Sequence, residues 1–426
     1  MFSIPDRSGV HGARPTPAIA ARAIDSAGAP SASSSPATFD DAPSVRLLAD
    51  TLREAARRNA SDLHVEPLEQ GWRVRLRIDG VLHEIARPPA HLRDAFVTRI
   101  KVLARMDIAE RRIPQDGRLR LAPRGDAQPQ EDYRVNSLPT IHGEKLVLRR
   151  LEALPADLSL SALGLDVMQR EALSAAIGAP HGLVLVTGPT GSGKTLSLYC
   201  FLQKLNDASR NLCSVEDPAE IQLAGINQVN VREKAGLTFA LALRALLRQD
   251  PDVIMIGEIR DEETASVAVK AAQTGHLVLS TLHTNDAPAA IARLIDIGVE
   301  PYNLAAALRL VTAQRLVRKL CPQCRQPSDA SAATLRAAGL ADDAQPYIAR
   351  GCEACHGIGY RGRVGIHEVM PVSAAMRDMI VARRSAQDIA RLARTEGVST
   401  LRDAALARVR DGTTSLAEAL AATDAS

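Results

Sequence analysis

Residues 182–195 read GLVLVTGPTGSGKT, and this stretch decides the fold. It starts with four apolar residues, Leu183 to Val186, which have the length and β-branching of a buried parallel strand. The spacing G-x-x-x-x-G-K-T that follows is typical of a phosphate-binding P-loop. Its glycines let backbone N–H groups surround phosphate oxygens, and a helix expected over residues 194–205 points its positive end at the anion. The predicted nucleotide site comprises Gly188, Pro189, Thr190, Gly191, Ser192, Gly193, Lys194 and Thr195.

Two of these side chains have predicted roles. Lys194 is expected to reach the β and γ phosphates, and the Thr195 hydroxyl is expected to be a ligand of Mg²⁺. The order of strand, loop and helix makes a chance glycine-rich turn a poor explanation of the same residues.

The composition sets limits on the whole chain. Its 426 residues are enough for two or three domains, and its net charge of +3 is too small to indicate a nucleic-acid or membrane ligand. Aromatic residues make up only 3%, which disfavours a binder of single-stranded nucleic acid. No segment approaches the ~20 apolar residues that span a bilayer, so we expect a cytoplasmic protein. Its six cysteines are then more consistent with thiols or metal ligands than with disulfides.

The part before the P-loop divides into three segments. Residues 1–44, rich in Pro, Ala, Ser and Gly, are expected to be a disordered tail. Residues 45–150 combine helical and alternating patterns and predict a small α+β domain. Residues 151–163 form a plausible linker. The α+β domain carries many arginines, which are explained either as a solvated strand face or as contacts to the phosphates of nucleotide bound elsewhere.

Residues 164–426 alternate between strand and helix patterns, which predicts a parallel, doubly wound sheet with its ligands at the carboxyl ends of the strands. After the P-loop, strands are expected at 212–215, 253–256 and 277–280, with helices between them. Four more helices are expected within residues 373–422, where they would cap the domain.

Polar residues follow three of the predicted strands. Glu258 comes after an apolar strand, where P-loop proteins carry a Walker B acid, and could act through the water shell of Mg²⁺, on the attacking water, or both. Glu216, with Asp217, ends the preceding strand and suits a general base or a water-positioning group. His283 lies past the end of the third strand and is preferred to His276 as a sensor of the γ phosphate.

The cysteines give a second strong signal. Cys321-Pro-Gln-Cys324 and Cys352-Glu-Ala-Cys355 are two C-x-x-C pairs separated by 27 residues. They predict a closed, structural Cys₄ zinc site within residues 319–363, with a helix near 331–338 between the pairs. Cys200 and Cys213 are expected to be buried core residues.

The motifs together resemble those of the secretion ATPases of type II secretion systems and type IV pilus assembly, over residues 45–420. The resemblance rests on SDLHVEP, RLRIDGVL, RRIPQDGR, GEKLVLR, GPTGSGKT, SVEDPAEIQ, RQDPDVIMIGEIRD, GHLVLSTLHTNDA, QRLVRKLCPQC and GYRGRVGIHEVM, in this order. The tetracysteine element is similar to that of secretion and pilus-extension ATPases, whereas retraction motors typically lack it.

The resemblance implies a RecA-like ATPase domain preceded by a small PAS-like domain, and homo-hexameric rings. It implies ATP and Mg²⁺ as ligands, structural Zn²⁺, and peripheral association with the inner membrane through platform proteins. Glu258, Glu216 and His283 match the family's catalytic acids and histidine-box residue, and Arg118 and Arg134 match arginines that contact the phosphates. Family members usually carry a further N-terminal domain, which leaves the mode of membrane recruitment open.

The expected function is therefore ATP hydrolysis that powers type II protein secretion by driving assembly of a pseudopilus. A motor for type IV pilus extension or DNA uptake shares every motif. A nucleic-acid translocase, and a nucleotide-binding scaffold without turnover, are the less favoured readings, and no nucleic-acid partner is expected.

Overall fold

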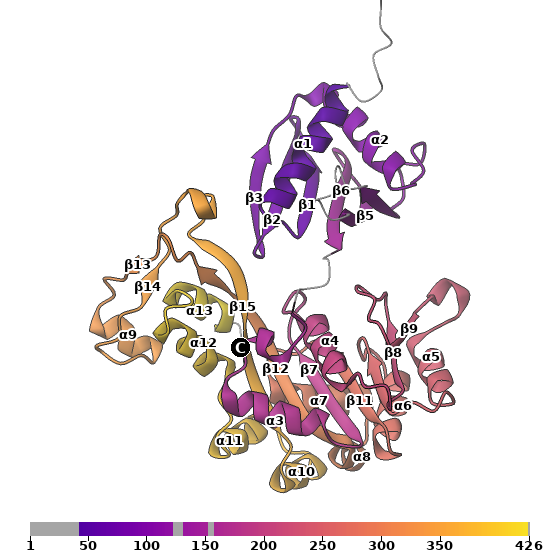
Figure 1. Ribbon diagram of the computed structural model, residues 1–426, viewed down its shortest axis with the longest axis vertical. Helices are drawn as coiled ribbons and strands as arrows, with labels where there is room; N and C mark the ends of the chain where they lie inside the picture. The colour runs from indigo at the N-terminus through magenta and orange to yellow at the C-terminus, as the bar shows by residue number, and fades with distance from the viewer. Residues whose placement is uncertain (1–41, 122–130, 152–156, 425–426) are drawn as a thin grey trace, which may run out of the picture.

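The computed structural model describes residues 42–121, 131–151 and 157–424. The predicted tail therefore lies almost entirely outside the described residues, as does part of the predicted linker. Figure 1 shows an N-terminal domain, in indigo and purple, above a larger domain. Across the described ranges, we find no helix with the length and apolar content needed to pass through a bilayer.

The N-terminal domain is a six-stranded antiparallel sheet with two helices on one face, in the order β3-β2-β1-β6-β5-β4. Strand β2 alternates strictly, so that Trp72, Val74 and Leu76 are buried while the arginines between them point to the other face. The buried face packs on both helices, through residues such as Leu52 and Phe96. The elements are α1 (Pro43–Arg57), β1 (Asp62–Pro67), β2 (Trp72–Ile78), β3 (Val81–Ala86), η2 (Ala90–Leu92), α2 (Arg93–Leu103), β4 (Gln115–Leu121), β5 (Glu131–Thr140) and β6 (Gly143–Leu151).

The larger domain is built on a seven-stranded sheet in the order β15-β12-β7-β11-β10-β8-β9. Six neighbouring strands run parallel, and β15 is antiparallel to β12 at one edge. The predicted α/β fold is confirmed, but β9, β12 and β15 were not among the predicted strands. The strands are β7 (Gly182–Thr187), β8 (Leu212–Glu216), β9 (Asn227–Asn230), β10 (Val253–Ile256), β11 (Leu277–Leu282), β12 (Leu308–Leu320) and β15 (Tyr360–Pro371).

Helices cover both faces of this sheet. Successive residues of β7 point to opposite faces, so Val184 and Val186 join one hydrophobic core with α3 and α4, and Leu183 and Leu185 join the other with α5 to α8. Cys200 and Cys213 are buried free thiols of these cores, as predicted. The helices are η3 (Leu160–Leu163), α3 (Val167–Ile177), α4 (Lys194–Leu205), η4 (Glu233–Ala235), α5 (Phe239–Leu246), α6 (Glu262–Gln273), α7 (Ala287–Ile297) and α8 (Pro301–Ala307).

The C-terminal part adds the cysteine element and four helices. The element contains β13 (Gln326–Pro327), α9 (Ala332–Ala338), β14 (Tyr347–Ile348) and η5 (Glu353–Cys355), and β15 leads out of it. The helices α10 (Ala374–Val381), α11 (Ala386–Thr395), α12 (Leu401–Arg410) and α13 (Leu416–Thr423) extend one of the two cores. Each begins after a Ser or Thr whose side chain accepts a backbone N–H of the first turn, which stabilises short helices.

The chain enters the larger domain through a segment that is pinned to β15. The His367 ring Nε2 lies 2.9 Å from the Leu163 carbonyl oxygen, and Arg408 donates to the carbonyl of Gly164. Gln169, in the first turn of α3, donates to the His367 carbonyl at 2.8 Å. These bonds fix the point at which the linker ends.

Candidate functional site

The P-loop connects β7 to α4 with the geometry of an anion site. Gly188, Gly191 and Gly193 have φ values of +149°, +80° and +88°, in the region that favours glycine. Gly193 is the N-cap of α4, so the helix begins at Lys194 and presents its first N–H groups to the loop. The predicted phosphate-binding residues therefore occupy one turn between a buried strand and a helix N-terminus.

A side chain that was not predicted holds this loop. Gln314 of β12 is 3% exposed; its amide nitrogen donates to the Ser192 carbonyl at 2.7 Å, and its amide oxygen accepts from the Ser197 hydroxyl at 2.7 Å. A Cβ at position 193 would lie 2.8 Å from this amide nitrogen, and one at 188 would lie 2.3 Å from the Gln314 carbonyl. Because β12 approaches so closely, positions 188 and 193 both require glycine. The contact of Gln314 with Ser192 also fixes the loop on the side that faces β12.

Lys194 lies over the loop that it belongs to. Its ammonium donates to the carbonyls of Gly188 at 2.8 Å and Pro189 at 3.1 Å, and the residue is 9% exposed. Burial lowers the pKa of Lys194, while the nearby negative charge of Glu258 raises it. A phosphate would offer this buried ammonium a stronger, charge-assisted acceptor than the two neutral carbonyls.

Glu258 and His283 meet at the carboxyl ends of β10 and β11. The His283 Nε2 lies 3.3 Å from one carboxylate oxygen of Glu258, and Arg260 donates to the other. Partial burial raises the pKa of Glu258, but Arg260 and His283 outweigh it and hold the pKa below its usual value. The carboxylate is thus ionised at neutral pH, as a group that orients water or a metal-bound water must be.

The start of the P-loop is hydrogen-bonded to the segment that follows β11. The Thr187 and Thr284 hydroxyls lie 2.7 Å apart, and the Thr284 backbone N–H donates to the Thr187 hydroxyl at 2.8 Å. His283 immediately precedes Thr284, so these bonds fix the position of His283 relative to the P-loop. This contact couples β7 to the end of β11, beyond the pairing of the strands themselves.

Glu216 lies in a different environment from Glu258. It is 3% exposed, and its carboxylate accepts hydrogen bonds from Tyr199 at 2.5 Å, Ser214 at 2.6 Å and Gln228 at 3.0 Å. Burial, followed by the bond to Glu216, raises the pKa of Tyr199 well above its ordinary value. These described contacts connect α4, β8 and β9, so Glu216 is anchored to the helix that follows the P-loop.

Arg118 and Arg134 are direct cross-strand partners on β4 and β5, with Arg149 of β6 next in the same row. Arg118 is bound to Asp132 through contacts of 2.8 Å and 2.5 Å within its own domain. Among the residues that the structure describes, no hydrogen bond or ion pair joins Arg118 or Arg134 to the P-loop. The arginines thus form a row on the open face of the N-terminal sheet.

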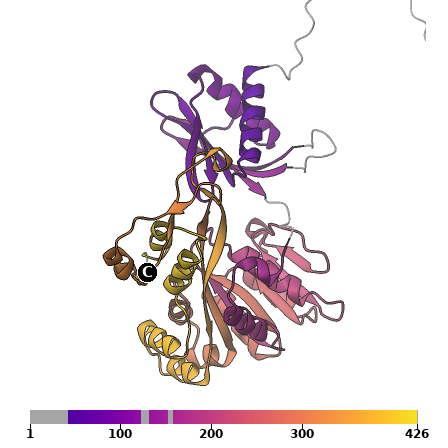
Figure 2. The same cartoon turned by 60° about the vertical axis from the view of Figure 1, so that its left-hand side comes forward.

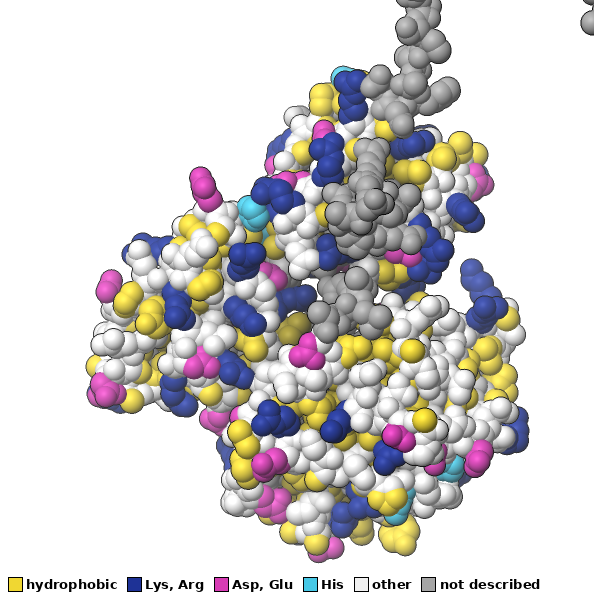
Figure 3. Space-filling model, viewed as in Figure 1, with side chains coloured by type: hydrophobic (Ala, Val, Ile, Leu, Met, Phe, Trp, Pro, Cys, Tyr) yellow, Lys and Arg dark blue, Asp and Glu magenta, His cyan; other side chains and the backbone are white. Residues whose placement is uncertain are grey.

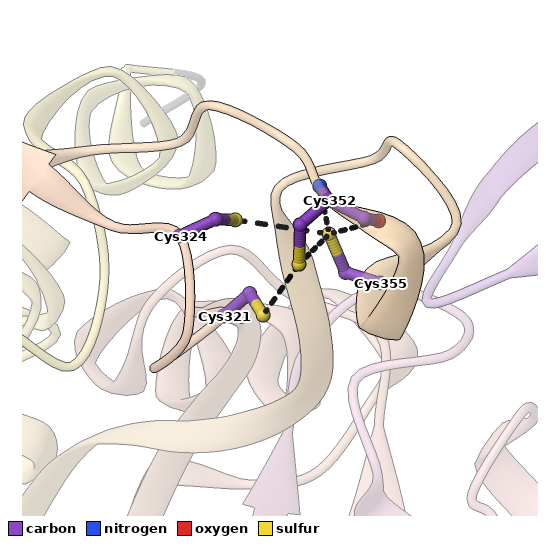
Figure 4. Close-up of side chains that lie close together, drawn as sticks. All are labelled: Cys321, Cys324, Cys352 and Cys355. Atoms are coloured by element: carbon purple, nitrogen blue, oxygen red, sulfur yellow. Dashed lines mark hydrogen bonds between the residues drawn. The ribbon is translucent and has the colours of Figure 1, made fainter.

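The four predicted cysteines converge (Figure 4). The sulfur atoms of Cys321, Cys324, Cys352 and Cys355 all lie within 4.8 Å of one another, and three of the pairs are 3.7–3.9 Å apart. Four thiolates arranged tetrahedrally around Zn²⁺ at about 2.3 Å have sulfur atoms about 3.8 Å apart, so the spacing fits this ion. Burial raises the pKa of Cys355, but the backbone N–H groups of Cys352 and Gly359 bring it to about 7, which favours a thiolate ligand.

Three contacts at the site were missed from the sequence. Arg260 stands two residues after Glu258 and could have been found as a cation beside the strand end. Tyr199 lies one turn after Thr195 on α4, where an inward-facing hydroxyl signals a buried polar partner. Gln314 had no local signal, because its role depends on β12 lying beside β7.

A parallel sheet that carries a P-loop after β7, with an ionised Glu at the end of β10, two strands away in the same sheet, defines a P-loop ATPase. A model of the family described as "Type II/IV secretion system protein" matches residues 37–421, and the chain belongs to this family. The resemblance seen in the motifs is thereby confirmed.

Relatives of two kinds match this chain at similar identity. It is 50% identical over 386 residues to the "Type II secretion system protein E" of Pseudomonas aeruginosa, covering 90% of this chain and 76% of the relative. It is 48% identical over 384 residues to the "Type IV pilus assembly ATPase PilB" of Myxococcus xanthus, covering 89% of this chain and 68% of the relative.

Solved structures with the same fold include the pilus retraction motor PilT with bound ADP, at a TM-score of 0.58 and 27% identity, covering 88% of this chain and 96% of that one. The ATPase DotB of Legionella pneumophila has a TM-score of 0.65 at 22% identity, covering 92% of this chain and 98% of that one.

Proposed function

We propose that this protein is a Mg²⁺-dependent ATPase motor that powers type II protein secretion by driving pseudopilus assembly at the inner membrane. The observation that carries the proposal is a complete P-loop in the same sheet as an ionised Glu258 at the end of β10, two strands away, in a chain that is 50% identical to a type II secretion protein E. The motor acts as a homo-hexamer that associates peripherally with the membrane through platform proteins.

The residues divide the chemistry among them. The backbone of the P-loop and Lys194 would hold the β and γ phosphates, and the Thr195 hydroxyl, in the first turn of α4, would hold Mg²⁺, which would screen the phosphate charge. Water attacks the γ phosphorus in line with the breaking bond to the β-γ bridging oxygen, and Glu258 orients this water and accepts its proton. His283, which contacts Glu258, senses the state of the γ phosphate. Glu216 acts by fixing α4 and the loop after β8.

Domain movement completes the site. Arg118 and Arg134 lie side by side on a face of the N-terminal sheet. Their positive charges would stabilise the negative charge on the γ phosphate during transfer. To reach it, Arg118 must exchange Asp132 for phosphate, from its own chain or from a neighbour in the ring. Hydrolysis is then conditional on domain closure, which converts the chemical step into movement.

A second candidate is a motor for type IV pilus assembly or DNA uptake, favoured by the 48% identity to a pilus assembly ATPase. The two are separated by complementation of strains that lack either their secretion ATPase or their pilus-assembly ATPase. Restored secretion without restored pili supports the first candidate, and the reverse result replaces it with the second.

The enzymatic part is tested with Glu258→Gln. The variant should bind ATP with the affinity of the wild type and lose turnover by at least about a hundredfold, as loss of a positioned acid or base does. Glu263→Gln is a matched control, because Glu263 is an exposed acid on α6 that pairs with Arg244. Hydrolysis by Glu258→Gln at the wild-type rate would refute the assignment.

The same assay tests the nucleic-acid translocase. On the face shown in Figure 3, Lys and Arg side chains are scattered among acidic and apolar ones rather than gathered in one patch. The small net charge of +3 and the 3% of aromatic residues also disfavour a nucleic-acid ligand, so DNA added at low salt should leave the ATPase rate unchanged. Strong stimulation that falls steeply with salt would instead support a translocase.

A further inference from the structure

The cysteine element contacts the N-terminal domain at the turn between β2 and β3. One Asp79 carboxylate oxygen accepts the Gly362 backbone N–H at 2.8 Å, and the other lies 3.8 Å from the Arg363 guanidinium. The Asp79 side chain is 19% exposed at this contact. In Figure 2, the loop that leads into β15 lies against the indigo strands of the N-terminal domain.

Two further contacts extend this interface. Ile358 packs against the hydrophobic core of the N-terminal domain, although it belongs to the cysteine element and lies 207 residues after Leu151, the end of that domain's last strand. The Arg57 guanidinium, at the end of α1, lies 3.5 Å from the His356 ring. Residues 351–363, here called the docking segment, therefore meet the N-terminal domain through an apolar, a polar and a charged contact.

The cysteines determine the shape of the docking segment. Gly351 and Gly359 donate their backbone N–H groups to the sulfurs of Cys324 and Cys355, at 3.3 Å and 3.1 Å. Gly357 donates to the Cys352 carbonyl at 2.9 Å. Ile358 thus lies in a tight turn whose ends are bound to the four-sulfur cluster.

The other end of the cluster is continuous with the P-loop. Cys321 follows directly on β12, the strand whose Gln314 holds Ser192. Arg318 of β12 lies over the Tyr360 ring at 4.1 Å from its centroid, which ties the strand to the start of β15. The docking segment is therefore attached to β12, the same strand whose Gln314 holds the P-loop.

We propose that residues 351–363 are the surface on which the N-terminal domain of this chain docks, with Asp79 as the principal contact and the cysteine site as the device that keeps the surface in shape. The interface borders an open hollow lined by residues of both domains, including Arg58 and Glu353. This docking does not depend on which transport system the motor serves.

The test is hydrogen exchange of the intact, zinc-loaded chain without nucleotide, followed by mass spectrometry. Asp79→Asn removes the charge while retaining the turn, because Asn tolerates the φ of +48° found at this position. The Gly362 region and the β2–β3 turn should exchange at least about tenfold faster than in the wild type. Asp94→Asn, which removes an acid that pairs with Arg93 within the same domain, should change neither region.

Two more arms keep the proposal falsifiable. Ile358→Ser should expose the same turn from the other side of the interface. Removal of the metal with a zinc chelator should deprotect the β2–β3 turn while leaving the buried centre of β2 protected. Wild-type protection of the turn in Asp79→Asn and Ile358→Ser, or in the metal-free protein, would overturn the proposal.

Discussion

Gln314→Leu should loosen the P-loop without replacing any residue of the predicted nucleotide site. The substitution removes two buried hydrogen bonds, at about 1 kcal/mol each, and leaves the Ser192 carbonyl without its donor, which adds about 1–2 kcal/mol. The Ser197 hydroxyl keeps a long bond of 3.4 Å to the Gly193 carbonyl, so its loss is partly offset. The expected fall in stability of the ATPase domain is about 3 kcal/mol.

The affinity for nucleotide should fall as well. If the loop holds its binding conformation for only about one-tenth of the time, the apparent Kd for ATP rises about tenfold. Titration calorimetry with a non-hydrolysable ATP analogue measures this Kd, and urea denaturation measures the stability. Gln314→Glu retains the acceptor for Ser197 but places a buried carboxylate beside the Ser192 carbonyl, so this variant should not recover the stability.

Thr312→Val is the matched control on the same strand. The Thr312 hydroxyl is buried and has no hydrogen-bond partner among the residues that the structure describes, so its replacement by a methyl group should be neutral or stabilising. If Gln314→Leu binds the analogue as tightly as Thr312→Val does, the argument that β12 holds the phosphate loop is wrong.

Three further predictions concern other parts of the chain. Burial lowers the pKa of His367 to about 4, below its value of about 6.5 in the unfolded chain. The free energy of unfolding should therefore be highest above pH 6.5 and fall by about 3 kcal/mol as the pH falls to 4. His367→Gln should flatten this part of the plot of unfolding free energy against pH, and an unchanged slope would contradict the assignment. Tyr199→Phe leaves the buried Glu216 with one donor fewer and should destabilise the domain by about 1–3 kcal/mol, as thermal unfolding will record, while Tyr302→Phe, at an exposed position on α8, should have no effect. Cys321→Ser should reduce bound zinc below the expected one mole per chain and lower the melting temperature, and a metal-free variant with unchanged stability would argue against a structural ion.

The features that the sequence predicts well are local ones. The P-loop, the start of α4 at Lys194 and the Ser- or Thr-capped C-terminal helices each depend on residues within a few positions of one another. The tetracysteine cluster could also be predicted, because each C-x-x-C pair forms its own tight turn and four thiols require one shared partner. In these cases the spacing of residues in the sequence is enough to predict the local structure and its ligand.

The features that were missed depend on pairing between distant segments. Strand β12 has Arg315 and Arg318 among its apolar residues, which obscures its pattern, and each of the two donates a hydrogen bond to α13, about 100 residues later. Strand β15 pairs with β12 across the whole cysteine element. The environment of Glu216 also escaped prediction, because Tyr199 and Gln228 come from two other elements.

Because the start of the larger domain is hydrogen-bonded to β15, the linker limits how far the N-terminal domain can move from it. The last residue of β6 is Leu151, and the segment fixed on β15 by His367 begins at Leu160. The nine peptide steps between them can span at most about 30 Å when fully extended. If the docking contact opens, the end of β6 stays within this distance of Leu160, so the length of the linker limits which surfaces the N-terminal domain can reach.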